Sequence, residues 1–266
     1  MKKIGFLGCG NIAKAIAGGA IKAGCIAGKD LFCFDIDKKK AEPFLGLGAT
    51  LADSSATLAG QVDILFLTVK PQVLPAVLEE LKPHLPKDVL LVSPVAGVRI
   101  AKLEAMLNEG YRIIRVMPNT PLCSGAGATA LSRNAIVTDA EFSFVTKLFA
   151  ACGVTAALPE EQLDAVTGVS GSSPAFFMRF AKAIIAAGVA DGMKEEDAKR
   201  LVLQTMAGTA KMVMESEQSI DDLICAVASP GGTTEAGLKT MDALQFDQTT
   251  SAVLTAAIHR SKELAK

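Results

Sequence analysis

The stretch GFLGCGNIAKAI, residues 5–16, decides the fold prediction for this 266-residue chain. A short apolar run ends in a turn with the spacing G-x-G-x-x-A, formed by Gly8, Gly10 and Ala13, and a helical pattern follows. The first glycine permits a tight turn, the second lets a pyrophosphate approach the backbone, and the small third residue lets helix and strand pack closely. The first N–H groups of the helix can then bind the anion. The motif is weak evidence alone, but it is strong evidence directly after the first strand of an alternating pattern.

The N-terminal part of the chain supplies that alternation. Helical patterns at 37–45, 75–81, 100–107 and 139–151 separate short apolar runs, which lie at 31–35, 62–69, 89–95, 112–117, 125–131 and 154–158. Continuous apolar strands between helices are typical of a parallel sheet that is covered on both faces. The predicted fold class is therefore α/β, with an N-terminal Rossmann-type doubly wound sheet.

The character of the sequence changes after about Glu161, because strand-like runs stop. Ser173 and Pro174 form a predicted helix start, a cap followed by a first-turn proline. The next segment, 175–191, is apolar on all sides, so we expect it to be buried, with a partner subunit as a plausible cover. Further helices are expected near 195–214, 234–244 and 248–264. We predict two domains, a dinucleotide-binding Rossmann domain at 1–160 and an all-helical substrate and dimerisation domain at 161–266.

Composition excludes several other classes of protein. A net charge of −1 gives no field for binding nucleic acid. No run of about 18 residues is apolar and free of charge, which predicts no membrane span. We expect the N-terminal stretch to form the first strand rather than a signal peptide. The six cysteines form no CxxC pair, so we expect reduced, mostly buried thiols in a cytoplasmic protein. The two histidines are far apart, without acidic or cysteine neighbours at ligand spacing, so no metal site is predicted.

The second predicted strand ends at Asp35, whose carboxylate can bind a ribose 2′-hydroxyl and repel a 2′-phosphate. This position favours NADH. Lys38, Lys39 and Lys40 follow within one helical turn. They can form a solvated face or neutralise a phosphate, so NADPH remains open as the cofactor.

The sequence offers no strong acid of the kind that carbonyl reduction needs. The only tyrosine, Tyr111, is followed four residues later by Arg115 rather than by the lysine of short-chain dehydrogenases. An imine is easier to reduce, because a protonated C=N already carries its positive charge. Three loops could position such a substrate: VKPQ at 69–72, RVMPNTP at 115–121 and SPGGTT at 229–234. Successive N–H groups of Gly232, Thr233 and Thr234 at a helix start predict a carboxylate site.

Taken in order, five motifs resemble the pyrroline-5-carboxylate reductase family over essentially the full chain. They are GCGNIAKAI at 8–16, VKPQ at 69–72, RVMPNTP at 115–121, DAVTGVSGSSPAF at 164–176 and SPGGTTEAGL at 229–238. The resemblance implies reduction of 1-pyrroline-5-carboxylate to L-proline by hydride transfer from NAD(P)H. It also implies an intertwined homodimer through the helical domain, assembled into a larger ring such as a decamer.

The resemblance further implies roles for individual residues. Thr234 resembles the family's threonine whose hydroxyl contacts the imine nitrogen of the substrate. It is therefore the expected catalytic residue. The other expected substrate-binding residues are Glu161, Ser229, Gly232 and Thr233. The expected cofactor-binding residues are Gly8, Gly10, Asn11, Ile12, Asp35, Thr68, Val69, Lys70, Pro71, Val95 and Ala96.

The chain also departs from the family pattern. Ser173 and Phe176 stand where the family usually has glycine and tyrosine, and Ala226 and Ala228 replace polar residues before Ser229. Asp35 stands where the family often has serine or asparagine. Two alternatives therefore stay open, a reductase of another cyclic imino acid and a nucleotide-binding paralogue without turnover.

Overall fold

The computed structural model describes residues 2–108 and 110–264, and it divides into two compact units. Unit 1 comprises residues 1–174 and 257–266, and unit 2 comprises residues 175–256. Each unit is described by itself. These units are defined by their compactness. The boundary between a cofactor-binding and a substrate-binding domain at residues 160 and 161 stays a prediction.

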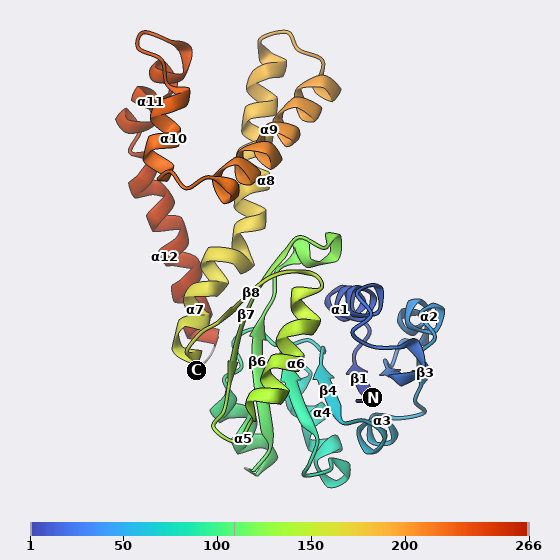
Figure 1. The fold of residues 1–266 in the computed structure, drawn as a ribbon. Helices are drawn as coiled ribbons and strands as arrows, with labels where there is room; N and C mark the ends of the chain where they lie inside the picture. Colours follow the sequence, from blue (N-terminus) through green and yellow to red (C-terminus); the bar gives the residue numbers. More distant parts are fainter. Residues whose placement is uncertain (1, 109, 265–266) are drawn as a thin grey trace. The chain divides into compact units, whose positions relative to one another are not determined.

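Unit 1 contains an eight-stranded sheet in the order β3-β2-β1-β4-β5-β6-β7-β8 (Figure 1). The strands are β1 (Ile4–Leu7), β2 (Leu31–Phe34), β3 (Thr50–Leu51), β4 (Ile64–Leu67), β5 (Leu90–Ser93), β6 (Arg112–Met117), β7 (Gly127–Arg133) and β8 (Gly153–Ala157). β1 lies between β2 and β4, so the chain reverses its direction of travel across the sheet at this point. In open α/β sheets, ligands bind beyond the carboxyl ends of the strands at such a switch point.

Helices cover both faces of the sheet, which gives unit 1 three layers. The helices are α1 (Asn11–Lys22), α2 (Lys38–Gly46), α3 (Ser55–Gln61), α4 (Leu74–Leu81), α5 (Ile100–Leu107) and α6 (Asp139–Ala150). One buried cluster joins α1, α2 and α6 to the sheet, and a second joins α3, α4 and α5. Phe6 and Phe66, from neighbouring strands, stack with ring centroids 4.6 Å apart in the first cluster. The doubly wound fold predicted from the sequence is confirmed.

Two details of the sheet differ from the expected pattern. The two-residue strand β3 has no apolar run and was not expected. β7 runs antiparallel to β6, because residues 118–126 form only a short connection with the 3₁₀ turn Thr120–Ser124. A parallel return needs a crossover of about a dozen residues or more.

α8 begins at Ser173, as predicted, but Ser173 does not cap the start of a new helix. The chain is already helical from residue 160, through α7 (Leu163–Val166) and a π-helical segment (Thr167–Ser172), into α8 (Ser173–Ala190). Ser173 has helical dihedrals, and its buried hydroxyl donates to the carbonyl oxygen of Gly168 at 2.8 Å. The hydroxyl therefore pairs within the continuous helix and caps no new one.

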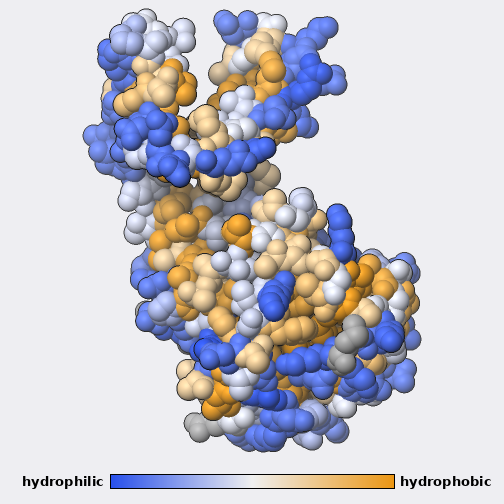
Figure 2. All heavy atoms as spheres, in the orientation of Figure 1, coloured by the Kyte–Doolittle hydropathy of each residue, from blue (hydrophilic) through white to orange (hydrophobic). Residues whose placement is uncertain are grey.

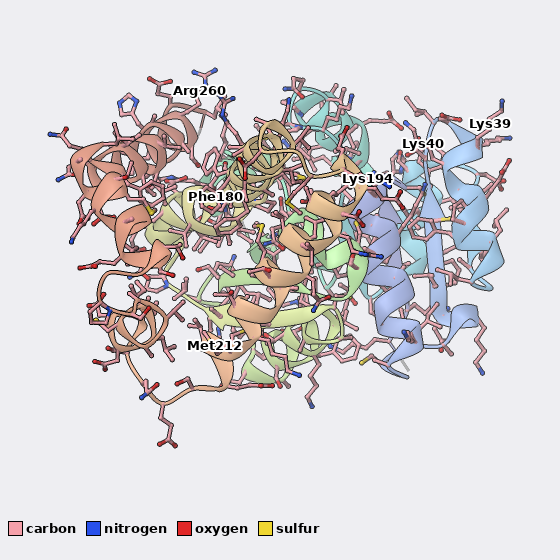
Figure 3. The ribbon with its side chains drawn as sticks, turned by 90° about the horizontal axis from the view of Figure 1, so that it is seen from above. Lys39, Lys40, Phe180, Lys194, Met212 and Arg260 are labelled. Carbon is pink, nitrogen blue, oxygen red and sulfur yellow. The ribbon has the colours of Figure 1, made fainter. Side chains whose placement is uncertain are left out.

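Unit 2 is entirely helical in its described residues. After α8 come α9 (Glu195–Glu215), α10 (Ile220–Val227), α11 (Thr233–Ala243) and α12 (Phe246–Leu264), whose last turns belong to unit 1. α10 was not predicted. The ring of Phe180 in α8, labelled in Figure 3, lies 6.3 Å from the ring of Phe246 in α12, and both side chains remain partly exposed.

The chain itself does not bury segment 175–191, which agrees with the expectation that its cover comes from a partner subunit. Phe177 is 60% exposed and Met178 is 65% exposed, and Figure 2 shows hydrophobic side chains at the surface of this helical region. By length and composition, the helix Glu160–Ala190 is apolar enough to cross a membrane. It contains Arg179 and Lys182, so it has no long charge-free run. An apolar helix in such a small unit requires cover from outside the chain.

Candidate active site

The glycine-rich turn joins β1 to α1 at the carboxyl edge of the sheet. Gly8 has a φ of +99°, and its N–H donates to the carbonyl of Phe34 at 2.8 Å. A Cβ at Gly8 would lie 2.7 Å from the carbonyl oxygen of Thr68, whereas a Cβ at Gly10 would meet no atom within 4 Å. Position 8 therefore requires glycine, because its φ is positive and there is no room for a Cβ. The space at Gly10 is free for a ligand.

The N-terminus of α1 is available to an anion. Gly10 is the N-cap, no side chain caps the helix, and its first turn contains no acidic residue. The exposed Asn11 and the half-buried Ile12 form this turn. Free N–H groups and the positive end of the helix dipole together favour a phosphate here.

Asp35 is fixed against the glycine-rich turn from the neighbouring strand. Its Oδ2 accepts from the N–H of Cys9 at 2.8 Å, and its Oδ1 accepts from the N–H of Asp37 at 2.9 Å. Each oxygen keeps a second lone pair for a ligand hydroxyl. A carboxylate held at this place also puts negative charge where a 2′-phosphate would have to lie.

The three lysines after Asp35 belong to α2. Asp37 caps this helix by accepting from the N–H of Lys39 at 3.2 Å, and it lies 4.0 Å from Nζ of Lys40. Figure 3 shows Lys39 and Lys40 pointing outwards from α2. Their exposure agrees with a solvated helix face. At the N-terminus of α2, the Asp37 side chain already accepts a hydrogen bond from a backbone N–H that a phosphate could otherwise bind.

The loops after β4 and β5 form the next part of this edge. The hydroxyl of Thr68 lies 2.7 Å from the carbonyl oxygen of Gly8 and 3.1 Å from that of Leu7, which ties β4 to the glycine-rich turn. The loops continue as Val69, Lys70 and Pro71 after β4, and as Val95 and Ala96 after β5. A small, mostly apolar cavity of about 180 Å³ lies between them, with Pro71 and Ala96 in its wall.

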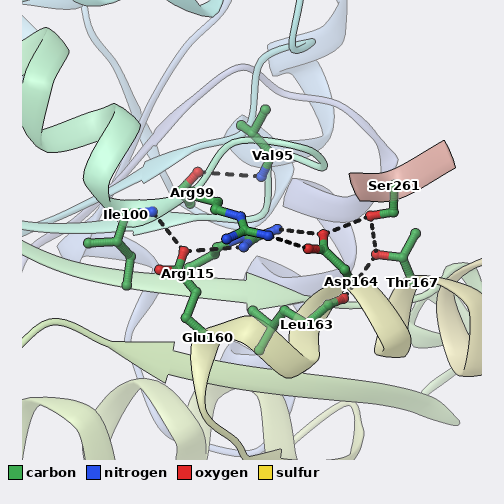
Figure 4. A network of polar contacts seen from close by, with 10 residues as sticks. Val95, Arg99, Ile100, Arg115, Glu160, Leu163, Asp164, Thr167 and Ser261 are labelled. Atoms are coloured by element: carbon green, nitrogen blue, oxygen red, sulfur yellow. Dashed lines mark hydrogen bonds and ion pairs between the residues drawn. The ribbon is translucent and has the colours of Figure 1, made fainter. Parts of the chain in front are cut away.

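A buried polar network fixes the loop after β5 to α7 (Figure 4). Asp164 is fully buried and accepts from Nη2 of Arg99 at 2.8 Å and from the hydroxyl of Ser261 at 3.0 Å. Nη2 of Arg115 lies 3.8 Å from Asp164, and Nη1 of Arg115 donates to Glu160 at 3.2 Å. Two arginines and two carboxylates balance one another, as buried charges require.

Glu160 and Asp164, rather than Glu161, provide the carboxylates of this network. Glu160 Oε1 also accepts from the N–H of Ile100 at 2.7 Å, at the first turn of α5. Glu161 is exposed, and no hydrogen bond or ion pair to another described residue is found for it. The expectation that Glu161 binds substrate stays a prediction. Sequence spacing alone could not separate these acidic neighbours.

The start of α11 in unit 2 is the place where the sequence predicts a carboxylate site. Gly232 is the N-cap, and no side chain caps the helix. The N–H of Gly232 itself donates to the carbonyl of Ser229 at 3.0 Å. Among the described residues the N–H groups of Thr233 and Thr234 have no backbone acceptor, so these two remain as donors. The substrate role of Gly232 stays a prediction.

Glu235 lies in the first turn of the same helix. It pairs with Lys239 at 2.9 Å and accepts from the N–H of Gly231 at 2.6 Å. The Lys239 ammonium and the Gly231 N–H hold the pKa of Glu235 below its usual range. The glutamate is therefore an anion at neutral pH, and it limits how many negative charges the helix start can take.

Within the described residues, the histidines and cysteines form no metal-binding site. No cluster of three or more potential metal ligands is found there. His259 does have an acidic neighbour, Glu263, at 3.2 Å one helical turn away on the surface, which corrects the expectation that neither histidine has one. Cys9, Cys33 and Cys152 are buried, whereas Cys123 and Cys225 are exposed. The hydrogen bond to Cys33 and burial raise the pKa of the Cys9 thiol, so this thiol is a poor nucleophile.

Comparison with known proteins shows where this arrangement occurs. The chain is 36% identical over 269 residues to the pyrroline-5-carboxylate reductase of Escherichia coli, and the match covers 100% of this chain and 99% of the relative. It is 38% identical to the Pseudomonas aeruginosa enzyme of the same name, covering 99% and 97%. The chain belongs to the pyrroline-5-carboxylate reductase family. Residues 160–264 also match the family model described as pyrroline-5-carboxylate reductase dimerisation.

Solved pyrroline-5-carboxylate reductases share the fold along the whole chain. A Plasmodium falciparum structure with NADP bound has a TM-score of 0.91 at 34% identity, covering 100% of this chain and 98% of that one. A Coxiella burnetii structure has a TM-score of 0.93 at 33% identity, covering 100% and 99%. Residues 3–97 match a model described as NADP oxidoreductase, coenzyme F420-dependent. The exposed apolar side chains of α8 lie within the residues that match the dimerisation model.

Proposed function

We propose that this chain reduces 1-pyrroline-5-carboxylate to L-proline with NAD(P)H, the last step of proline biosynthesis. The observation that carries the proposal is the full-length relationship to pyrroline-5-carboxylate reductases together with two uncapped helix starts. One helix start follows a glycine-rich turn suited to a dinucleotide, and the other follows the turn Ser229–Gly232.

The residues of unit 1 are proposed to hold the cofactor. Gly8 shapes the turn and Gly10 leaves room for the pyrophosphate, which the first N–H groups of α1, at Asn11 and Ile12, would bind. Asp35 is proposed to bind the adenosine ribose. Further along the edge, the proposed wall beside the nicotinamide consists of Thr68, Val69, Lys70, Pro71, Val95 and Ala96. NAD(P)H, when bound, supplies the hydride for the C=N carbon.

The helix start in unit 2 is proposed to hold the substrate. The N–H groups of Thr233 and Thr234 bind the carboxylate, supported by Ser229 and Gly232, and the Thr234 hydroxyl orients the imine nitrogen. The protonated imine already carries positive charge, so reduction gives a neutral amine and no strong acid has to act on the ring. Glu161 is retained as a proposed substrate residue on resemblance alone.

The finer properties are also proposals. The fixed carboxylate of Asp35 and the outward lysines of α2 favour NADH over NADPH. The functional boundary is proposed between residues 160 and 161. The homodimer is proposed to assemble further into a ring such as a decamer in the cytoplasm, without a nucleic-acid or membrane partner.

The direct test is to incubate the purified protein with 1-pyrroline-5-carboxylate and either NADH or NADPH. Nucleotide oxidation should match proline formation mole for mole. A six-membered cyclic imino acid in a parallel reaction tests the alternative substrate, which Ala226 and Ala228 near the turn leave open. Cofactor binding without turnover on either imine would contradict the proposal and favour the inactive paralogue.

A further inference from the structure

The π-helical segment Thr167–Ser172 ends two residues before Pro174, at the start of α8. In α-helical spacing the N–H that bonds a carbonyl comes from the residue four positions later, and four positions after Ser170 stands Pro174, which has no N–H. The carbonyl oxygen of Ser170 instead accepts from the side-chain Nδ2 of Asn119 at 3.2 Å. A residue from the loop after β6 thus satisfies a helix carbonyl that the proline leaves open. Such π-helical segments frequently occur at functional sites.

The other end of the Asn119 side chain is also occupied. Its Oδ1 accepts from the N–H of Ala128 in β7 at 2.9 Å. Asn119 is in addition the N-cap of the 3₁₀ turn Thr120–Ser124, and its carbonyl accepts from the N–H of the buried Leu122 at 3.2 Å. One residue therefore joins β7, the π-helical segment and the 3₁₀ turn.

The 3₁₀ turn lies against the beginning of α1. The thiol of Cys123, in this turn, lies 3.8 Å from the carbonyl oxygen of Asn11, the first residue of α1. Movement of the turn would therefore reach the helix start that is proposed to hold the pyrophosphate. The polar atoms of the Asn119 side chain are engaged within the protein, so its contribution is indirect.

We infer that Asn119 is a positioning residue that fixes the 3₁₀ turn against the cofactor-binding end of α1 by replacing the missing Pro174 N–H at the Ser170 carbonyl. The inference rests on the proposed function, because it assumes that this end of α1 binds NAD(P)H. Its particular claim is that the hydrogen bond to Ser170, rather than the asparagine as such, maintains cofactor affinity.

The test uses the dissociation constant of NADPH and NADH, measured by fluorescence titration of the full-length protein without substrate. Asn119→Ala removes the hydrogen bonds to both Ser170 and Ala128, so it should weaken binding by at least about fivefold, the effect of one lost hydrogen bond. Pro174→Ala restores an N–H one turn after Ser170, so the double variant should keep the Ser170 carbonyl paired and recover part of the lost affinity. Pro174→Ala alone should bind cofactor like the wild type.

Asn134→Ala is the matched control. Asn134 directly follows β7 and also joins it to β6, through hydrogen bonds to Tyr111, Ile113 and Glu104, but it does so at the opposite end, where β6 starts. This variant should lower the melting temperature and leave the cofactor dissociation constant unchanged.

Three results would overturn the inference. They are unchanged affinity in Asn119→Ala, an equal loss of affinity in Asn134→Ala, or no recovery in a double variant that melts like Asn119→Ala. Failure of the proposed activity would look different, because the wild type would bind cofactor and still not reduce the imine.

Discussion

The carboxylate of Asp35 accepts a hydrogen bond from the backbone N–H of Cys9 at 2.8 Å. The acidic group at the end of β2 is therefore part of the glycine-rich turn in space, although 26 residues separate the two in sequence. Asp35 thus has two roles, as a negative charge and as the hydrogen-bond acceptor of Cys9. A mutation that keeps the acceptor oxygen and removes the charge separates these roles.

Asp35→Asn keeps an oxygen for the Cys9 N–H and removes the negative charge. We expect the ratio of kcat/KM for NADPH to that for NADH to rise about tenfold, because repulsion of the 2′-phosphate is relieved. Steady-state kinetics with both cofactors measure this ratio. Asp37→Asn, which alters the neighbouring helix cap, is the control and should change the ratio less. An unchanged ratio in Asp35→Asn would mean that another group sets cofactor preference.

Thr234→Ala should lower kcat about 100-fold, the effect of removing one positioned donor or acceptor at a reacting group. The dissociation constant of the cofactor should not change. Thr234→Ser, which retains the hydroxyl, should keep most of the activity. Thr240→Ala is the control in the same helix, because its hydroxyl bonds only the carbonyl of Ala236 among the described residues. Normal turnover of Thr234→Ala would remove this residue from the mechanism.

Asp164→Asn should lower the free energy of unfolding by about 3 kcal/mol, because it leaves the buried Arg115 without one of its two carboxylates. Ser261→Ala removes a neutral hydrogen bond from the same carboxylate and should cost about 1 kcal/mol. Urea denaturation of both variants tests the difference. Equal losses would show that the charge balance of the network contributes nothing.

Glu141→Gln should destabilise the protein by about 1 kcal/mol at pH 7. A glutamine can still accept from Thr138 in the capping box of α6, but it loses the charge that pairs with Arg112. Burial raises the pKa of Glu141, but hydrogen bonds from the Thr138 N–H and hydroxyl, with Arg112 and Lys2, outweigh it and hold the pKa below its usual range. The ionised form thus favours the folded state.

That stabilisation is complete above the unfolded pKa of about 4.3 and is lost as the pH falls through the lower folded pKa. The urea midpoints of Glu141→Gln and wild type should therefore converge as the pH falls through the folded pKa of Glu141, which lies below its usual range. Glu42→Gln, at an exposed position of α2, is the control. Its urea midpoint should equal that of the wild type over the same pH range. A gap that stayed constant with pH would show that the charge of Glu141 is irrelevant.

Phe177→Glu should convert the homo-oligomer to a smaller species, because it places a charge on the apolar face of α8. Light scattering coupled to size exclusion measures the mass. Leu45→Glu makes the same change at a partly exposed apolar residue of α2 in unit 1 and should leave the mass unchanged. If both variants kept the wild-type mass, α8 would not be part of the interface.

The sequence predicted those elements whose signal is local. Runs such as Ile64–Leu67 are apolar throughout because these strands are buried on both faces, and they were recognised for that reason. Strand β3 has two residues and only one half-buried apolar side chain, Leu51. It is too short to show the hydrophobic pattern by which a strand is predicted from sequence. Ser173–Pro174 has the local chemistry of a helix start, but the helix had already begun at residue 160.

The candidate site follows the same division. The glycine-rich turn and the start of α11 are contiguous motifs, so the sequence alone predicts both as candidate sites. The carboxylate that neutralises Arg99 comes from Asp164, 65 residues away, and no spacing rule points to Asp164 or Glu160 in preference to Glu161. The hydrogen bond between Asn119 and Ser170 likewise depends on tertiary folding, which local patterns do not contain.

The hydroxyl of Ser261 reaches back over 97 residues to Asp164, and residues 257–264 belong to unit 1 although unit 2 precedes them. On the ribosome, the nucleotide-binding half therefore stays unfinished until the whole helical insertion has been synthesised. Asp164 acquires its serine partner among the final contacts of biosynthesis, so a nascent chain halted within α11 would carry an incomplete Rossmann unit.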